Sequence, residues 1–256
     1  MKIEFAEIGQ VDDKELKFAV ISAFFQGKWI FVKHKKRDTW EIPGGHREIG
    51  EDINDTAKRE LFEESGAIDF ELTPICDYLC DYSVVEDKES SYGRLFYAKI
   101  NELGALPDSE IGKIELFNEL PEKLTYSEIQ PYLHNRVIKQ MIKDKYLGKQ
   151  VNVIMDRVLG SKHPKYGFVY PVNYGYIKNT VSGDGEEIDA YVIGEFEPLE
   201  SYKGYVVAII CRKNDNEDKL VVCKDFNIYN KDQIRALTEF QERFFKSEII
   251  MFKNYS

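Results

Sequence analysis

The order of apolar and polar residues in the first half of the chain predicts a unit rich in strands. The segments 18–25 and 29–32 are apolar, β-branched or aromatic, and the polar residues around Gly27 that separate them are typical of a hairpin turn. Two further strands are expected at about 70–82 and 93–100. We therefore expect a hairpin and additional strands in a mixed α/β unit.

Two helices are expected among these strands. Residues 52–65 carry apolar side chains at helical spacing, and the segment stops at Gly66. Farther along, Thr125 and Glu128 have the spacing of a capping box, in which the two residues satisfy each other's free amides. This box predicts a second helix that opens at Thr125 and runs to about Leu147.

A second series of strands and a helix is expected after a short connection at Gly148. A strand is expected at 151–155, and the apolar runs 205–210 and 219–223 bracket the polar loop 213–218, which predicts another hairpin. Near the end of the chain an Asn-x-x-Gln sequence can cap a closing helix. We interpret its apolar stripe as core, and the stripe consists of Ile234, Leu237, Phe240, Phe244 and Phe245.

Length and composition favour two folded domains. The chain has 256 residues, of which 43% are hydrophobic and 31% are charged, so it can build packed cores under an ordinary polar surface. We place the boundary near residue 149, between a first domain of residues 1–148 and a second of residues 149–256.

The net charge of −10 argues against a nucleic-acid partner, because such binding relies on clustered Lys and Arg. An acidic protein can still bind a small phosphate compound when divalent cations on its carboxylates reverse the local field. We therefore expect small-molecule ligands; the sequence gives no indication of the oligomeric state.

Cysteine spacing and hydropathy predict a cytoplasmic protein. There is no CxxC pair or zinc spacing, and reduced structural thiols are the favoured interpretation. No run approaches the about 20 apolar residues of a membrane span, and the first residues lack the layout of a secretion signal. We expect no membrane association. The cysteines in question are Cys76, Cys80, Cys211 and Cys223.

Three carboxylates gather on one face of the helix expected at 52–65. Glu60, Glu63 and Glu64 are three and four residues apart, so they lie within about one turn of each other and repel. Three acids alone would be interpreted as a solvated helix face. A bound divalent cation with oxygen ligands is the alternative that neutralises them.

The residues around these acids favour the cation. The turn at Gly44 and Gly45 lets the backbone approach closely, so the carbonyl of Gly44 could add a ligand. Arg59 can orient a carboxylate through its planar guanidinium, and Glu51 adds a further acid. A metal site therefore explains the segment better than a solvated helix face.

Residues 45–67 resemble the box of the Nudix hydrolases: Gly, five residues, Glu, seven residues, then Arg-Glu-aliphatic-any-Glu-Glu-any-Gly-aliphatic. The last position departs, because Ala67 replaces a larger aliphatic residue. The resemblance covers about residues 1–146 and implies an α/β/α sandwich with a mixed sheet. It also implies Mg²⁺ or Mn²⁺ bound to an acid set in which Glu51 and the Gly44 carbonyl support Glu60, Glu63 and Glu64.

The same resemblance implies a general base that activates water against a phosphorus atom. Some family members use a Glu from a later loop, and Glu110 is the candidate here, with Glu64 as the competitor. An ordinary surface carboxylate is the alternative interpretation of Glu110. Arg59 would act by orienting the metal-binding acids.

A second acidic segment, with Asp184, Glu186 and Asp189, follows a turn rich in Tyr, Asn and Gly at 170–177. Glycines beside spaced acids let a loop fold around a cation, although a surface turn is the plain alternative. The spacing excludes an EF-hand. This stretch resembles the soluble family I inorganic pyrophosphatases, whose hallmark is an Asn-Tyr-Gly turn followed by an acidic metal loop.

That resemblance implies a small OB-like β-barrel flanked by the closing helix. Glu186 stands where the family has the Asp linked to activation of water, and the segment is short for the family. The roles implied are metal ligands at Asp184, Glu186, Asp189, Asp215 and Glu217, and phosphate contacts at Arg157, Tyr174 and Lys219.

The pairing of the two resemblances suggests the substrate. Cleavage of a nucleoside triphosphate between the α and β phosphates releases pyrophosphate, which the second domain could convert to phosphate. Damaged nucleotides such as 8-oxo-dGTP fit the first family. The alternatives are a nucleotide sugar or dinucleotide as substrate, and a second domain that senses phosphates without turnover. His46 could touch substrate, whereas His34, His134 and His163 are expected at the surface.

Overall fold

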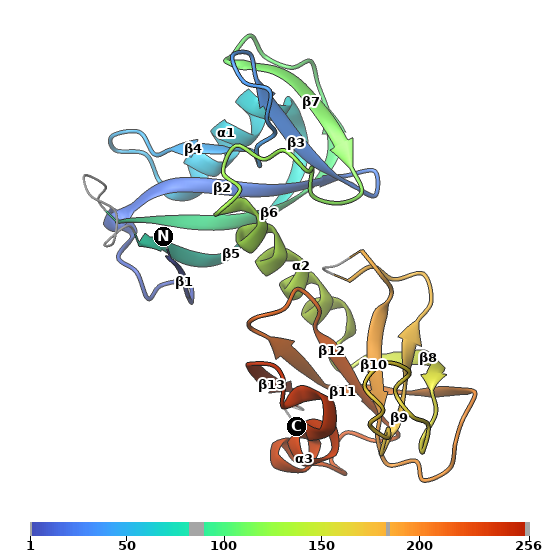
Figure 1. Cartoon of the computed structure of the whole chain (residues 1–256). Coiled ribbons are helices and arrows are strands. Elements are labelled where there is room, and N and C mark those ends of the chain that lie inside the picture. Colours follow the sequence, from blue (N-terminus) through green and yellow to red (C-terminus); the bar gives the residue numbers. More distant parts are fainter. Residues whose placement is uncertain (1, 82–89, 183–184, 254–256) are drawn as a thin grey trace. The chain divides into compact units, whose positions relative to one another are not determined.

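The computed structural model describes residues 2–81, 90–182 and 185–253. Contacts divide the chain into two compact units, Met1–Val137 and Ile138–Ser256, each of which is described by itself (Figure 1). The division falls inside helix α2 (Gln130–Tyr146). Because a continuous helix crosses this point, the division locates no linker, and the domain boundary near residue 149 stays a prediction.

A mixed sheet forms the first unit. Its strand order is β1-β5-β6-β2-β3-β7, with β4 paired to β2 outside this path. β2 and β6 are parallel, and the other pairs are antiparallel. The strands, with one 3-10 helix at Asp13–Glu15, are β1 (Lys2–Ala6), β2 (Leu16–Phe25), β3 (Lys28–His34), β4 (Gly44–His46), β5 (Ala67–Asp81), β6 (Ser91–Leu103) and β7 (Ile111–Phe117).

The predicted hairpin is confirmed as the turn between β2 and β3. Gln26 and Gly27 have φ values of 50° and 81°, and Phe25 pairs directly with Lys28. Positive φ at both central positions matches the twist of the flanking strands. The strands expected at 70–82 and 93–100 are also confirmed as β5 and β6.

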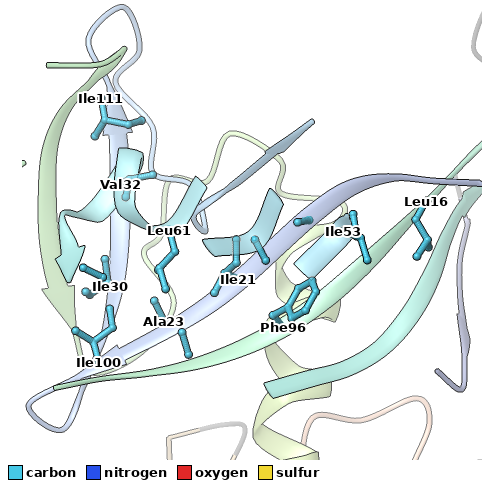
Figure 2. Packing of buried hydrophobic residues seen from close by; sticks show 14 residues of the cluster. Leu16, Ile21, Ala23, Ile30, Val32, Ile53, Leu61, Phe96, Ile100 and Ile111 are labelled. Carbon is cyan, nitrogen blue, oxygen red and sulfur yellow. The ribbon is translucent and has the colours of Figure 1, made fainter. Parts of the chain in front are cut away.

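Helix α1 (Ile53–Ser65) is confirmed where the periodicity places it. The Asp52 side chain accepts from the Asn54 amide at the start, and Gly66, with φ 72°, ends the helix in the left-handed conformation. Figure 2 shows Ile53 and Leu61 packed with Ile21 and Phe96 of the sheet. This packing fixes the helix face that carries the acids.

The first part of α2, residues 130–137, packs against the opposite face of the same sheet. On β2, Ile21 and Ala23 belong to the core under α1, whereas Ser22 between them bonds His134 of α2 at 3.1 Å. Successive side chains of a strand point to opposite faces, so the unit is a sandwich of helix, sheet and helix. His134 is only 2% exposed, and its expected surface position was wrong because the ring packs on Trp29.

The start of α2 differs from the capping-box prediction. The helix begins at Gln130, and Thr125 does not cap it, because its hydroxyl donates to Glu41 at 2.9 Å and also pairs with Thr39. A contact across the fold has replaced the local one. Pro131 follows in the first turn, where a missing backbone N–H is tolerated.

A closed barrel of five strands forms the second unit. The path β12-β10-β9-β8-β11 closes because β11 also pairs β12, and β13 extends it beside β11. The small barrel that the resemblance implies is thereby confirmed. The strands are β8 (Gln150–Arg157), β9 (Asn173–Ile177), β10 (Ile188–Val192), β11 (Ser201–Arg212), β12 (Lys219–Cys223) and β13 (Ser247–Met251).

Helix α3 (Lys231–Glu242) closes this unit with the predicted capping box between Asn230 and Gln233. Ile234 is fully buried in a cluster with Tyr191 of the barrel. The predicted stripe ends early, because the helix stops at Glu242 and Phe244 is 67% exposed. In the part of the chain that the structure describes, no helix is both long and apolar enough to cross a membrane.

Candidate active sites

A pocket of about 660 Å³ opens on the first unit where β4 meets α1. Gly44 and Gly45 of β4 line it; a side chain at Gly44 would clash with backbone, and one at Gly45 would displace the Glu60 carboxylate. A Cβ at Gly44 would lie 2.4 Å from the Ala19 carbonyl oxygen, and one at Gly45 would lie 2.2 Å from Glu60 Oε1. The glycines therefore let the strand lie directly against the acidic helix.

Glu64 is buried at the base of this pocket. The Gly44 amide donates to Glu64 Oε2 at 2.8 Å, and the side chain is only 9% exposed. Burial raises the pKa of Glu64 to about 8, and the charges of Glu60 and Glu41 add to the effect. Burial likewise raises the pKa of Glu60. The Glu64 carboxylate is thus held where a negative charge is poorly compensated, whereas Glu60 keeps a hydrogen bond from Arg59.

Arg59 ties together the acids on the solvent side. Its guanidinium donates to both oxygens of Glu51, at 2.9 and 3.0 Å, to Glu60 at 2.8 Å and to Glu63 at 3.1 Å. The hydrogen bond from Arg59 holds the pKa of Glu51 down at about 2. The structure thus places three of the four predicted acids on the Arg59 guanidinium, and Glu60, Glu64 and Gly44 line the pocket. The orienting role of Arg59 stays a prediction.

The chemistry of this donor set fits a hard divalent cation. Among residues 2–81, 90–182 and 185–253, no group of three or more His, Cys, Asp or Glu stands ready to hold a metal ion. Arg59 bonds three of the acids. Within these described residues, however, no ion pair joins Glu64 to a cationic side chain, and Glu64 and Glu60 both line the pocket. Oxygen ligands of this kind are what Mg²⁺ and Mn²⁺ prefer.

Glu110 lines the pocket from the segment before β7, as the sequence predicts for a later loop. Its Oε2 lies 3.4 Å from His34 Nε2, and the side chain is 71% exposed. The interpretation of His34 as a surface residue was incomplete, because this ring is mostly covered and lines the pocket. His46 also lines the pocket, with its ring 4.4 Å from that of Phe18.

Gln130 is a pocket residue that sequence reasoning missed. It lines the cavity from the first turn of α2, is 4% exposed, and its Oε1 has no hydrogen-bond partner among the described residues. A buried amide oxygen without a partner is destabilising unless a ligand or water supplies a donor. No local signal marks this residue, because only the packing of α2 against the sheet brings it to the pocket.

In the second unit, four of the predicted residues come together around Asp189. The Tyr174 hydroxyl donates to Asp189 Oδ2, and Lys219 Nζ lies 2.6 Å from the same oxygen and 2.5 Å from Glu217 Oε1. Burial raises the pKa of Glu217, and Lys219 opposes this shift. Two carboxylates therefore share one buried ammonium group.

The other residues predicted for this site have different surroundings. Arg157 pairs with its neighbour Asp156, and Glu186 is exposed. Asp215 bonds Arg212 at 2.9 Å. Asp184 falls outside the described residues. The structure thus assembles Tyr174, Asp189, Glu217 and Lys219, and it gives Asp215 a guanidinium as its partner.

The raised pKa of Glu64 predicts how stability depends on pH without metal. The unfolded carboxyl loses its proton near its ordinary pKa of 4.5, whereas the folded one keeps it to about 8. The folded state therefore binds more protons in this window, and stability falls as pH rises, by at most about 1.4 kcal/mol per unit. Thermal unfolding in EDTA should show a Tm advantage of Glu64→Gln that grows from about pH 5 to about pH 8. An advantage that stays constant would contradict the burial of an ionisable Glu64.

Both units match protein families. Residues 16–136 match the NUDIX domain, and residues 138–256 match the inorganic pyrophosphatase family. The chain therefore consists of a Nudix domain followed by an inorganic pyrophosphatase domain.

Two curated proteins are each similar to a part of this chain. YtkD of Bacillus subtilis, named as an 8-oxo-dGTP diphosphatase, is 35% identical over 102 residues, which are 40% of this chain and 61% of YtkD. The inorganic pyrophosphatase of Campylobacter jejuni is 35% identical over 91 residues, which are 36% of this chain and 45% of that protein. The chain thus spans less than two thirds of either relative.

A solved structure similar to part of the chain is that of a Bacillus subtilis pyrophosphohydrolase. It shares 23% identity, covers 54% of this chain and 90% of its own, and has a TM-score of 0.46.

Proposed function

We propose that the first domain is a divalent-metal-dependent hydrolase that converts a nucleoside triphosphate to the monophosphate and pyrophosphate. The observation that carries this proposal is the pair of carboxylates that line the pocket beside Gly44 and Gly45: Glu64 is buried, and the Glu60 side chain is 13% exposed. Buried acids with raised pKa values favour a ligand that brings positive charge. The match to the NUDIX domain supports the same chemistry.

Mg²⁺ or Mn²⁺ would be held by Glu60, Glu64 and the Gly44 carbonyl, with Glu51 and Glu63 in support. A cation there supplies charge to the phosphates and makes a bound water more acidic. The chain's own residues do the positioning. Arg59 fixes the acids, and the glycines keep the strand close to the helix.

Glu110 is the base that the geometry favours. It reaches the pocket from outside the acidic helix, and its exposed carboxylate can accept a proton from an attacking water and pass it to solvent. Glu64 is the weaker candidate for a proton acceptor, because the Gly44 amide already bonds one of its oxygens.

Gln130 is proposed to contact the base of the nucleotide. Its unpartnered Oε1 can accept an N–H from a ring edge, and an amide can pair with two adjacent atoms of a base. The name of YtkD makes 8-oxo-dGTP a substrate to test first.

Replacing Gln130 with leucine should remove base preference while the fold persists. A site built to hydrogen-bond its substrate discriminates through that bond. We therefore expect the free-energy difference between preferred and other bases, calculated from the ratio of their kcat/KM values, to shrink by about 1–3 kcal/mol. Gln140→Leu is the matched control, because Gln140 lies on the same helix but pairs with Asp144. An unchanged base preference in Gln130→Leu would contradict the assignment.

The second domain is proposed to hydrolyse pyrophosphate to phosphate. Asp189, with Glu186 and Asp184 of the preceding loop, would take the metal, and Tyr174 and Lys219 would orient Asp189 and meet the phosphate. Arg157 is a further phosphate contact in this proposal. The match to the inorganic pyrophosphatase family supports it.

Together the two domains favour a substrate that releases pyrophosphate. Each tenfold drop in pyrophosphate favours the first reaction by about 1.4 kcal/mol. The proposed ligands are small molecules, with no nucleic-acid or membrane partner, and we place the reaction in the cytoplasm, where thiols such as those of the four cysteines stay reduced.

A substrate panel tests the proposal. The full chain with Mg²⁺ is given nucleoside triphosphates, 8-oxo-dGTP, ADP-ribose, a nucleotide sugar and, separately, pyrophosphate. We expect monophosphate from the triphosphates and phosphate from pyrophosphate. Faster cleavage of ADP-ribose or the nucleotide sugar would overturn the substrate class, and inert pyrophosphate would overturn the role of the second domain.

A further inference from the structure

Arg212, at the end of β11, is a buried cation that neither resemblance assigns. Its side chain is 2% exposed. Nε and Nη2 donate to the two oxygens of Glu242, at 3.0 and 2.7 Å, and Nη1 lies 2.9 Å from Asp215 and 3.7 Å from Glu217. Three acids from the acidic loop and from α3 therefore surround one guanidinium.

The guanidinium is also fixed by its face. Its central carbon lies 3.6 Å from the centroid of the Phe245 ring, so one face is covered by an aromatic side chain. Glu242 is held further by the Tyr191 hydroxyl, which donates at 2.7 Å. With every nitrogen directed to a carboxylate, Arg212 is placed to neutralise acids and not to contact a phosphate.

The loop between β11 and β12 is locked around the same residue. Lys139 of α2 donates to the carbonyl of Arg212 and to that of Asp215, the latter at 3.1 Å, and pairs with Asp218 at 2.9 Å. The Arg212 amide donates to Asp218 at 3.0 Å. Asp215 and Asp218 of this loop thus each pair with a cationic side chain.

The arginine in the acidic cluster of the first domain is more exposed than Arg212. Arg59 also contacts three acids, but its side chain is 24% exposed. Glu64 lines the pocket nearby and forms no ion pair with a cationic side chain in the part of the chain that the structure describes. Around Arg212, Glu242 is bonded through both oxygens and Asp215 through one. Ligation of a metal by Glu242 would have to break a buried pair, which is strongly unfavourable. The Asp215 side chain is 31% exposed, and a metal there would compete with its hydrogen bond to the Arg212 guanidinium.

We propose that Arg212 is the resident cation of this acidic cluster, in the position a divalent ion would otherwise fill, and that Asp215 and Glu242 do not bind metal. A guanidinium stays charged at all working pH values and bonds carboxylates through a planar fork, so it can replace an ion permanently. In the second domain, the metal ligands would then be Asp189 and residues of the loop that precedes it.

Metal titration tests the ligand assignment. Mn²⁺ binding to the full chain is measured by calorimetry in a Glu64→Gln background, which weakens the first site, with and without Asp215→Asn. We expect the number of ions and their Kd to stay within twofold when Asp215 is changed. Loss of an ion, or a tenfold weaker Kd, would overturn the proposal.

Substitution of Arg212 tests the replacement of an ion. Arg212→Met leaves the acids without a cation, so its unfolding temperature in EDTA should fall below wild type, and added Mn²⁺ should raise it by more than in wild type. Arg212→Lys keeps one positive charge, so its unfolding temperature in EDTA should lie between those of Arg212→Met and wild type. An equal rise in unfolding temperature for Arg212→Met and wild type on adding Mn²⁺ would contradict the proposal. If Arg212→Met does not fold, the Mn²⁺ titration of Asp215→Asn still tests whether Asp215 binds metal.

Discussion

Changing Glu64 to glutamine is expected to abolish nucleotide hydrolysis while pyrophosphate hydrolysis continues. Glutamine keeps the size of the side chain and can accept from the Gly44 amide, but it removes the charge that would hold the cation. Loss of groups that merely support a metal ligand costs roughly 10–100-fold, so loss of a ligand should exceed about a hundredfold in kcat/KM. Monophosphate release from a triphosphate measures this effect.

The control for this change lies on the same helix. Asp55 is exposed, pairs with Lys58 and lies away from the pocket, so Asp55→Asn should hydrolyse nucleotides at the wild-type rate. The Glu64→Gln chain should unfold in EDTA at a temperature at or above wild type near neutral pH, because burial of an ionised Glu64 is unfavourable. Wild-type nucleotide hydrolysis by Glu64→Gln would refute the metal site in the first domain.

Changing Asp189 to asparagine should stop pyrophosphate hydrolysis and leave nucleotide cleavage intact. Asp189 is the acid that receives both the Tyr174 hydroxyl and the Lys219 ammonium. Asparagine removes the charge that both hold in place, and we expect a loss of more than about a hundredfold in phosphate release from pyrophosphate. Nucleotide cleavage by the same preparation shows that the chain is folded.

Asp232→Asn is the control in the second unit. This residue is exposed on α3 and pairs only with Arg235 among the contacts described, so its removal should change neither activity. If Asp189→Asn hydrolysed pyrophosphate at the wild-type rate, the proposed metal site of the second domain would be excluded.

Local sequence signals were enough to predict the acidic helix and its turn. The caps at Asp52 and Gly66 and the spacing of Glu60, Glu63 and Glu64 depend only on neighbouring residues, and the structure reproduces them. The hairpin at Gly27 and the capping box of α3 follow for the same reason. The barrel was predicted only from the family resemblance, because barrel closure depends on pairing between strands that are far apart in sequence.

The errors arose where a distant contact replaced a local one. Thr125 has the form of a helix cap, but Glu41 takes its hydroxyl, so α2 begins later. The sequence around His134 has no feature that distinguishes a buried ring from an exposed one. The ring is buried because it packs on Trp29 of the sheet. Arg212 and Gln130 also acquire their surroundings only through packing.

The products from one nucleoside triphosphate test the joint function most directly. Purified full chain with Mg²⁺ is given a deoxynucleoside triphosphate, without added pyrophosphatase, and monophosphate, pyrophosphate and phosphate are counted over time. Two domains that act in sequence predict two phosphates for each monophosphate, and the Asp189→Asn chain should instead release one pyrophosphate. Pyrophosphate that accumulates one for one with monophosphate in the wild-type chain would contradict the proposed function of the second domain.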